Sequence, residues 1–581
     1  MFTDEGKQAH ALALWRSRGF GVAASLVLVL ALVAPLAAGQ SAVRPETADA
    51  PVGIDGAREA DPVAAPLPSF AELEAAGAII GEIRVVTNNI FDTSDPRENR
   101  ALFRGANALH IKTRPSTVRR ALLFEPGQRV SAPIIAETER LLRAERYLYD
   151  VRIRPVAVRD GVVDIEIETR DTWTLYPTVS ISRSGGENRS ELGITELNLL
   201  GTGSKLSLGS FKDVDRDGKR LEFSNENAFG RRVAFDLTLS DNSDGSKQWL
   251  SLRRPFYALD TRWAAGASYA DDDRIEPVYN AGDTIAEYRL RRRLGEVFGG
   301  LSRGRVAGWV QRYSLGVSLQ EERFALEPGR VPPAELPDDE KLIGPFVRYE
   351  LIEDRYVQLQ NRNFMGRPEY FAYGLNARLQ LGWADTSLGS TYDALLYQIS
   401  VTRGFEPAPE HALFATAAVQ GQYADGEVRR QQAGARAQYF LPHHRRWLFY
   451  AALAADVLTN PDATDFLYLG GDNGLRGYPQ RYQSGTQRVL LTLEERLYTA
   501  VFPWRLFRIG AAAYVDVGRA WGGTNSNMDN PGWLANVGFG LRLFSVRTAD
   551  SNVVHMDFAF PLSPGDDVRS VQFLLSGKSR F

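Results

Sequence analysis

Aspartates at loop spacing are the first residues in this chain whose pattern could support metal chemistry. Asp213, Asp215 and Asp217, followed by Gly218, resemble the start of a calcium-binding loop. The twelfth position of such a loop is Ser224 here, where a glutamate would supply a bidentate carboxylate. We therefore predict a polar hairpin turn at this place and no metal site.

Signatures of catalysis are equally scarce. The chain has no cysteine, which excludes disulfides, thiol catalysis and thiolate metal sites. Its six histidines show no HExxH or paired spacing, and His443 and His444 lie in a turn rich in proline and arginine. There is no Gly-x-Ser-x-Gly elbow and no Walker loop. We expect a protein that is not an enzyme and that needs no cofactor.

Chain length and net charge limit the number of domains and the class of partner. A chain of 581 residues is too long for one ordinary domain and suggests two unequal ones. The net charge of −3 gives no basic excess, so we expect no nucleic-acid partner.

The N-terminus has the pattern of an export signal. Arg16 and Arg18 precede an apolar run over 19–38 that ends in small residues. This pattern predicts a signal peptide over 1–39, cleaved near Gly39 or Gln40. The alternative is a membrane anchor, because the run is nearly long enough to span a bilayer. The Ala/Pro-rich stretch 40–77 that follows is predicted to be a disordered linker.

Residues 78–172 have the pattern of a small α+β domain. Apolar residues alternate or recur at helical spacing in short segments. The expected elements are a strand at Ile83 and Val85, a helix capped by Ser116, a helix capped by Ser131, a strand starting at Val151, and a strand over 163–167. This order predicts a half-buried sheet with two helices on one face.

The remainder, 173–581, shows no convincing helix and recurring alternation. In 232–240, Val233, Phe235, Leu237 and Leu239 face one way, and polar or small residues face the other. Segments 511–519 and 536–544 repeat the pattern, and we count about 20 candidate strands. The alternative is a soluble sandwich or propeller. One face is so uniformly apolar, and the other so rich in Gly, Ser, Thr, Asp and Arg, that a closed transmembrane β-barrel is favoured.

The chain ends in a strand-like segment with a terminal aromatic residue, a sorting mark of outer-membrane barrels. Its apolar face and C-terminal signal comprise Val571, Phe573, Leu575, Gly577 and Phe581. Together with the signal peptide, this segment predicts the bacterial outer membrane as the location.

Several motifs occur in the order found in one known superfamily. The segment 470–478 contains Gly474, Leu475, Arg476, Gly477 and Tyr478, and resembles an Arg-Gly-aromatic signature. The run 198–203 resembles the turn after the second barrel strand, and Asp516 lies in a strand motif, Tyr-Val-Asp-Val-Gly. Over 78–581 the chain thus resembles the BamA/TamA superfamily of outer-membrane assembly and two-partner-secretion barrels, whose periplasmic POTRA domain has the order expected for 78–172.

The resemblance implies that the motif loop folds back into the barrel lumen. Arg476 would then be partly desolvated and would need anionic partners, and its planar guanidinium can meet carboxylates on two adjacent strands. We expect Glu494 and Asp516 in that role, with Glu495 replacing Glu494 if the strand register differs by one. The alternative is a solvated loop arginine.

The resemblance also implies protein insertion into, or translocation across, the outer membrane. The expected partners are the bilayer, unfolded barrel or secreted clients, and accessory proteins of the periplasm. Clients would bind the POTRA-like sheet and the seam between the first strand, near 173–181, and the last, 570–581. Rival functions are a passive porin-like channel and a structural surface antigen. Departures from the family are a count above 16 strands, a single POTRA-like domain, and the displaced Gly577.

Overall fold

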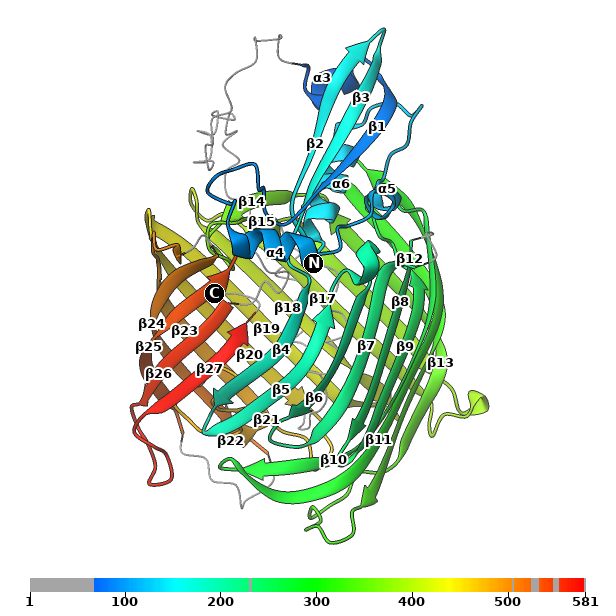
Figure 1. Cartoon of the computed structure of the whole chain (residues 1–581). Coiled ribbons are helices and arrows are strands. Elements are labelled where there is room, and N and C mark those ends of the chain that lie inside the picture. Colours follow the sequence, from blue (N-terminus) through cyan, green and yellow to red (C-terminus); the bar gives the residue numbers. More distant parts are fainter. Residues whose placement is uncertain (1–66, 229–231, 504–505, 524–531, 547–552, 579–581) are drawn as a thin grey trace. The chain divides into compact units, whose positions relative to one another are not determined.

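The computed structural model describes residues 67–228, 232–503, 506–523, 532–546 and 553–578 (Figure 1). The predicted signal peptide and residues 40–66 of the predicted linker lie outside these ranges. The chain divides into two compact units, an N-terminal one that reaches Thr174 and includes Leu200–Gly203, and one formed by Leu175–Leu199 and Ser204–Phe581. No helix in the described ranges is both long and apolar enough to cross a bilayer.

The N-terminal unit is a three-stranded sheet with helices. In the order β1-β3-β2, β3 lies in the middle, parallel to β1 and antiparallel to β2. Alternation places Val163, Ile165 and Ile167 of β3 in the core, where helix residues Val118 and Leu142 are also buried. The elements are α3 (Phe70–Ala75), β1 (Ile79–Asn88), α4 (Ala101–Leu109), α5 (Pro115–Ala121), α6 (Ala132–Ala144), β2 (Leu148–Arg159) and β3 (Val162–Asp171).

Two local features differ from the sequence predictions, and the cap of α6 agrees with its prediction in position. Helix α5 starts at Pro115 and its N-cap is Arg114, so the predicted cap at Ser116 is wrong; proline is favoured at the first helical position. Ser131 is the N-cap of α6, although its side chain makes no capping bond. Helix α3 lies within the predicted linker, because Ser69 and Glu72 form a reciprocal capping box.

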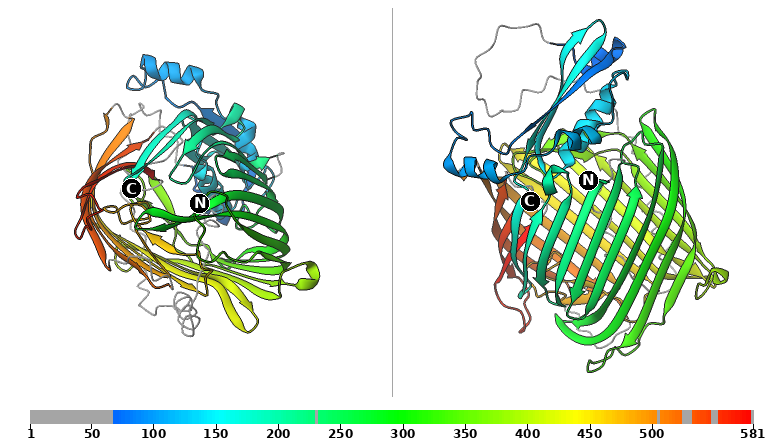
Figure 2. Two further views of the ribbon diagram at one scale, coloured as in Figure 1. Left: turned by 90° about the horizontal axis from the view of Figure 1, so that it is seen from below. Right: turned by 45° about the vertical axis from the view of Figure 1, so that its right-hand side comes forward.

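The second unit is a closed barrel of twenty strands within the described residues (Figure 2). Neighbouring strands pair antiparallel, and β27 returns to β4 to close the wall. The first ten strands are β4 (Leu175–Ser184), β5 (Glu187–Glu196), β6 (Lys205–Lys212), β7 (Asp217–Ala228), β8 (Val233–Asn242), β9 (Gly245–Arg254), β10 (Trp263–Asn280), β11 (Asp283–Val306), β12 (Trp309–Leu326) and β13 (Glu340–Glu353). The other ten are β16 (Asn376–Ala384), β17 (Ala394–Phe405), β18 (Ala412–Ala424), β19 (Glu427–His444), β20 (Trp447–Thr459), β23 (Gln487–Tyr498), β24 (Phe507–Trp521), β25 (Leu534–Ser545), β26 (Val553–Pro561) and β27 (Gln572–Lys578).

The two faces of the wall have the chemistry that the alternation predicts. On β25, Phe539 and Leu541 are 55% and 52% exposed, whereas Asn536 and Arg542 are fully buried on the lumen side. On β8, Leu239 is exposed while Asp236 is buried. An apolar outer face with a polar interior is the arrangement that a lipid bilayer requires.

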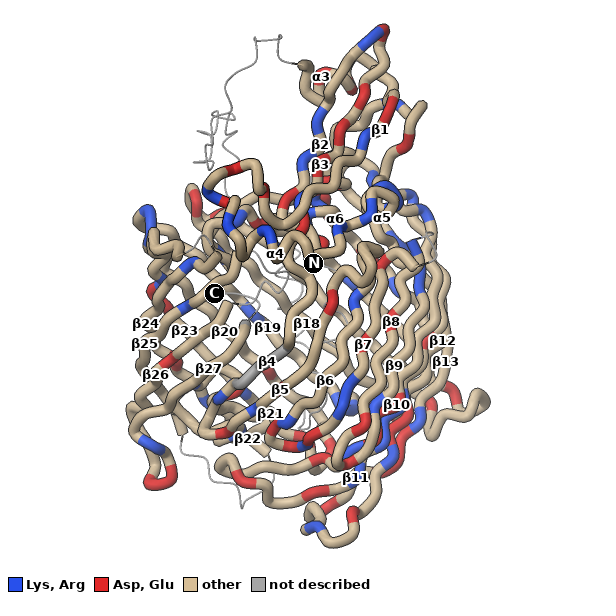
Figure 3. The backbone as a smooth tube through the Cα atoms, in the orientation of Figure 1, with Lys and Arg blue, Asp and Glu red and all other residues tan. Residues whose placement is uncertain are grey.

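Charged residues gather on β10 and β11, which are long strands of the wall. Asp271, Asp272 and Asp273 lie opposite Arg293, Arg292 and Arg291 along the pair (Figure 3). Such cross-strand pairs of opposite charge stabilise a wall that extends beyond an apolar zone.

The strand number matches the count from alternation and exceeds the sixteen that the family resemblance implies. Barrel diameter grows with strand number, so this lumen is wider than that of a sixteen-stranded barrel. Two short hairpins stand apart from the wall: β14 (Tyr356–Gln360) with β15 (Pro368–Ala372), and β21 (Leu467–Leu469) with β22 (Gln483–Gly485).

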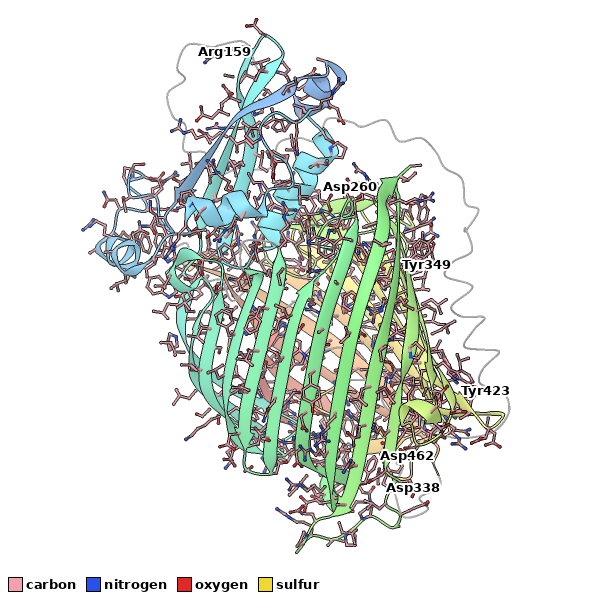
Figure 4. All side chains as sticks on the ribbon, turned by 90° about the vertical axis from the view of Figure 1, so that its right-hand side faces the viewer. Arg159, Asp260, Asp338, Tyr349, Tyr423 and Asp462 are labelled. Carbon is pink, nitrogen blue, oxygen red and sulfur yellow. The ribbon has the colours of Figure 1, made fainter. Side chains whose placement is uncertain are left out.

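The barrel has two distinct ends. We call the end where β4 begins and β27 ends the terminal end, and the opposite one the loop end. The β14–β15 hairpin belongs to the connection at the terminal end, and the β21–β22 hairpin to a connection at the loop end (Figure 1). Asp260 lies at the terminal end, and Asp338 and Asp462 lie at the loop end (Figure 4).

Candidate functional site: a loop clamped inside the barrel

The motif loop, residues 460–486 between β20 and β23, folds into the lumen. Its turn is held by backbone bonds from Leu475 N to Gly470 O (3.0 Å) and from Tyr478 N to Leu475 O (3.1 Å). Leu475 and Tyr478 are fully buried, in a cluster with Leu534 of β25. Gly477 lies against the wall so closely that a Cβ there would be 2.6 Å from the Cβ of Asn536. The tight turn therefore directs the preceding side chain, Arg476, at the wall.

Arg476 makes ion pairs with both predicted carboxylates. Its Nε and Nη2 donate to the two oxygens of Asp516 at 2.8 and 2.7 Å, and its Nη1 donates to Glu494 at 2.9 Å. All three side chains are buried. Burial lowers the pKa of Arg476, but Asp516 and Glu494 raise it more, so it stays well above its ordinary value. The solvated-loop alternative does not describe this arginine.

Wall residues complete this arginine clamp, which we define as Arg476, Glu494 and Asp516. Thr492 donates to Asp516 at 2.9 Å, and Asn536 Nδ2 donates to the other Asp516 oxygen at 2.9 Å. Asn536 also accepts from Gly477 N at 3.0 Å, so one amide joins loop and wall. The guanidinium lies 3.3 Å from the ring centroid of Tyr514. The buried carboxylates thus accept several hydrogen bonds besides the ion pair, as a buried ion pair requires.

Glu494 is shared with a second arginine. Arg496, on the same face of β23, donates to it through Nε at 2.9 Å and lies over Tyr450 at 3.8 Å. Glu495 faces the other way, where its carboxylate bonds His443 at 2.8 Å. The predicted register is therefore correct, and Glu495 is not a partner of Arg476.

A second insertion, which the sequence did not predict, enters from the terminal end. The β14–β15 hairpin and the residue that follows it place Met365, Phe371 and Tyr373 in a cluster with residues of seven wall strands. Phe364 stacks on Phe544 at 5.5 Å, and Phe371 on Phe414 at 5.1 Å. An apolar core inside the lumen at this end means that the hairpin fills part of the pore.

The motif loop also reaches the first strands of the barrel. Ser184 Oγ donates to Gly471 O at 2.5 Å, and Gln480 N donates to Gly185 O at 3.2 Å, both at the β4–β5 turn. Arg481 forms two bonds of 2.8 Å with Asp215 in the β6–β7 turn. The same loop is clamped to β23 and β24, so it braces the loop end across the junction of β27 and β4.

That junction is sparsely paired. Among the described residues, β27 and β4 share one register pair, Leu575 with Arg183, whereas β26 and β27 share seven, from Val553–Lys578 to Ala559–Gln572. Val571 and Phe573 are exposed on the outer face, in the alternation predicted for this segment. Gly577 is within β27, and Phe581 lies outside the described residues.

Comparison with known proteins finds no matching family model and no matching curated protein. Solved structures do match. They include BamA and CdiB barrels. The match to BamA from Haemophilus ducreyi lacking POTRA domains 1–3 has 14% sequence identity and a TM-score of 0.38. It covers 86% of this chain and 84% of that chain.

CdiB from Escherichia coli and from Acinetobacter baumannii give 14% identity each, coverage of 86% and 85% of this chain and of 76% and 74% of theirs, and TM-scores of 0.46 and 0.40. At these values the likeness concerns the fold alone.

Several residues of the site were not singled out from the sequence. Asn536, Tyr514 and Arg496 all lie on lumen-facing registers that the alternation had identified, which is the signal that could have found them. Asp215 was predicted only as a turn residue, and its bond to Arg481 joins positions 266 residues apart. Among the described residues, no group of three or more histidines or acids could hold a metal ion.

Proposed function

We propose that this protein inserts client polypeptides into the bacterial outer membrane or moves them across it. The observation that carries the proposal is the seam: among the described residues, one register pair joins β27 to β4, and a loop clamped to β23 and β24 braces the seam from within. A wall that is weakest at one defined place, beside a removable brace, is suited to lateral opening.

An opened seam would expose two strand edges. Unpaired N–H and C=O groups of β4 and β27 would template a client strand, as any exposed sheet edge does. Nothing in this step consumes a nucleotide, because the folding of the client itself supplies the free energy.

The N-terminal unit fits a role in client capture. We assign it as a POTRA-like domain in the periplasm, which places the terminal end of the barrel on the periplasmic side. Within its sheet, the described residues pair β2 with β3 alone, so its other edge is suited to strand addition by an extended client.

A passive channel is the main rival, and two features oppose it. The motif loop and the β14–β15 hairpin both occupy the lumen, one from each end, whereas a porin needs a water-filled passage. A purely structural surface antigen would need neither a sparsely paired seam nor an internal brace.

The test is depletion of the protein followed by quantitative proteomics of the outer membrane and the medium. Broad loss of barrel proteins would establish a general insertase, and loss of one or two secreted species would establish a dedicated transporter. Unchanged proteomes with reduced uptake of small solutes would refute the proposal in favour of the channel.

A further inference from the structure

A hollow interrupts the apolar outer wall near the terminal end. It has a volume of about 820 Å³ and is almost wholly apolar. Outward-facing side chains surround it on four neighbouring strands and extend to a fifth: Trp263 of β10, Leu301 of β11, Tyr313 and Leu315 of β12, Val347 and Tyr349 of β13, and Leu379 of β16. Figure 4 shows Tyr349 on this side of the barrel.

The hollow exists because small residues meet in one register row. Ala265 of β10 lies opposite Gly299 of β11, and Gly299 lies opposite Leu315 of β12. A Cβ added at Gly299 would have no atom within 4 Å. The adjacent row carries the large side chains Trp263, Leu301 and Tyr313, so the absence of a side chain at Gly299 leaves a recess beside them.

An arginine lies beside this recess on the lipid-facing side. Arg254 of β9 lies opposite Ala265 of β10, which follows Trp263 by two residues along the strand. Its guanidinium stacks 3.9 Å from the Trp263 ring, and donates to Trp263 O at 2.6 Å and to Tyr257 Oη at 3.3 Å. A charge on the lipid-facing surface of a barrel is costly unless an anion or water meets it. The rest of its N–H groups have no protein acceptor within the described ranges.

Two further arginines lie beyond the Trp263–Leu301 pair, toward the terminal end of the barrel. Arg262, in the β9–β10 connection, and Arg303, near the end of β11, are both exposed. The nearby carboxylate of Asp260 already accepts from Arg305 N at 3.0 Å. The apolar recess thus has Arg254 beside it and two exposed arginines beyond its outer row, which together complement a chain with an anionic head.

We propose that this recess binds an anionic phospholipid from the leaflet at the terminal end. One acyl chain lies over Gly299, between Trp263 and Leu315, and the phosphate meets Arg254, with Arg262 and Arg303 at the rim. Arginine suits this role because its planar group can donate two bonds to one phosphate. The inference rests on the membrane-spanning barrel and is independent of whether the protein moves clients.

The experiment is native mass spectrometry of the full-length protein in detergent, titrated with phosphatidylglycerol or with phosphatidylethanolamine. The wild type is expected to retain phosphatidylglycerol more strongly. Arg254→Gln removes a charge-assisted bond and is expected to weaken retention about tenfold. Gly299→Leu fills the recess without strain and is expected to abolish retention.

Two matched controls lie on the same outer face away from the recess. Gly295→Leu changes another outward glycine of β11, and Arg323→Gln removes an exposed arginine near the loop end. Both are expected to bind like the wild type. Equal retention of the two lipids by the wild type, or unchanged retention in Arg254→Gln and Gly299→Leu, would overturn the proposal. A heat-dependent gel shift checks that each variant forms the barrel, so a folding failure is recognised separately.

Discussion

Arg496 of the barrel wall donates through Nη1 to the main-chain carbonyl of Arg362 at 3.2 Å, while its Nε bonds Glu494. Arg362 belongs to the connection that carries the β14–β15 hairpin, and Glu494 belongs to the arginine clamp. One side chain thus joins the two insertions that fill the lumen from opposite ends. Because buried hydrogen-bonded networks respond as units, movement of either insertion is expected to disturb the other.

Replacing the clamp arginine should weaken the folded barrel. Arg476→Ala leaves Asp516 and Glu494 buried without their shared cation, and such a loss costs about 3–5 kcal/mol. Unfolding in urea, followed by the heat-dependent gel shift, measures it. Arg476→Lys should recover only part, because lysine cannot bond both oxygens of Asp516 and Glu494 together. Wild-type stability of Arg476→Ala would contradict the clamp.

Locking the seam should stop function without unfolding the barrel. The chain has no cysteine, so Arg183→Cys with Leu575→Cys introduces a single disulfide at the register pair that the described residues of β4 and β27 form. Under oxidising conditions we expect loss of outer-membrane proteins, as on depletion, and recovery on reduction. The matched control joins Phe558→Cys to Phe573→Cys across β26 and β27. If the seam lock leaves function intact, lateral opening is wrong.

Removing the hairpin should open the terminal end of the lumen. Deleting residues 356–372 and joining the ends with a short Gly-Ser link removes Phe364, Met365 and Phe371 from the lumen core. We expect higher conductance in planar bilayers than for the wild type. Shortening the loop between β12 and β13, over 328–338, is the control and should leave conductance unchanged. Equal conductance of the hairpin deletion and the wild type would show that the hairpin does not limit the pore.

Weakening the brace should loosen the motif loop. Arg481→Gln removes both bonds to Asp215 and with them the link to the β6–β7 turn. With Leu475→Cys as the reporter, which is fully buried, we expect faster maleimide labelling in the Arg481→Gln background. Arg429→Gln, which removes an exposed pair with Asp425, is the control and should label slowly. Equal labelling rates of Leu475→Cys with and without Arg481→Gln would mean that the arginine clamp alone holds the loop.

Much of this architecture could be predicted from the sequence, because a barrel wall obeys a period of two. Alternation at Val537, Phe539 and Leu541 identified the outer face, and the opposite face identified Asp516 as a lumen residue. The same register placed Glu494 rather than Glu495 inside. The number of strands followed from counting, since each crossing needs its own alternating segment. The helix start at Pro115 was missed because its N-cap, Arg114, makes no side-chain capping bond, whereas Ser116 is of a type favoured at N-caps.

The tertiary structure alone decided which distant residues meet. No local pattern relates Asp215 to Arg481, or Phe371 to Phe414, because these contacts depend on how far each insertion enters a lumen whose width is set by strand number. The sparse pairing between the described residues of β27 and β4 also cannot be predicted from either strand alone, since pairing depends on two edges and their stagger. The sequence by itself determined the wall and the sign of the charges facing inward. Closure of the barrel determined which residues those charged side chains contact.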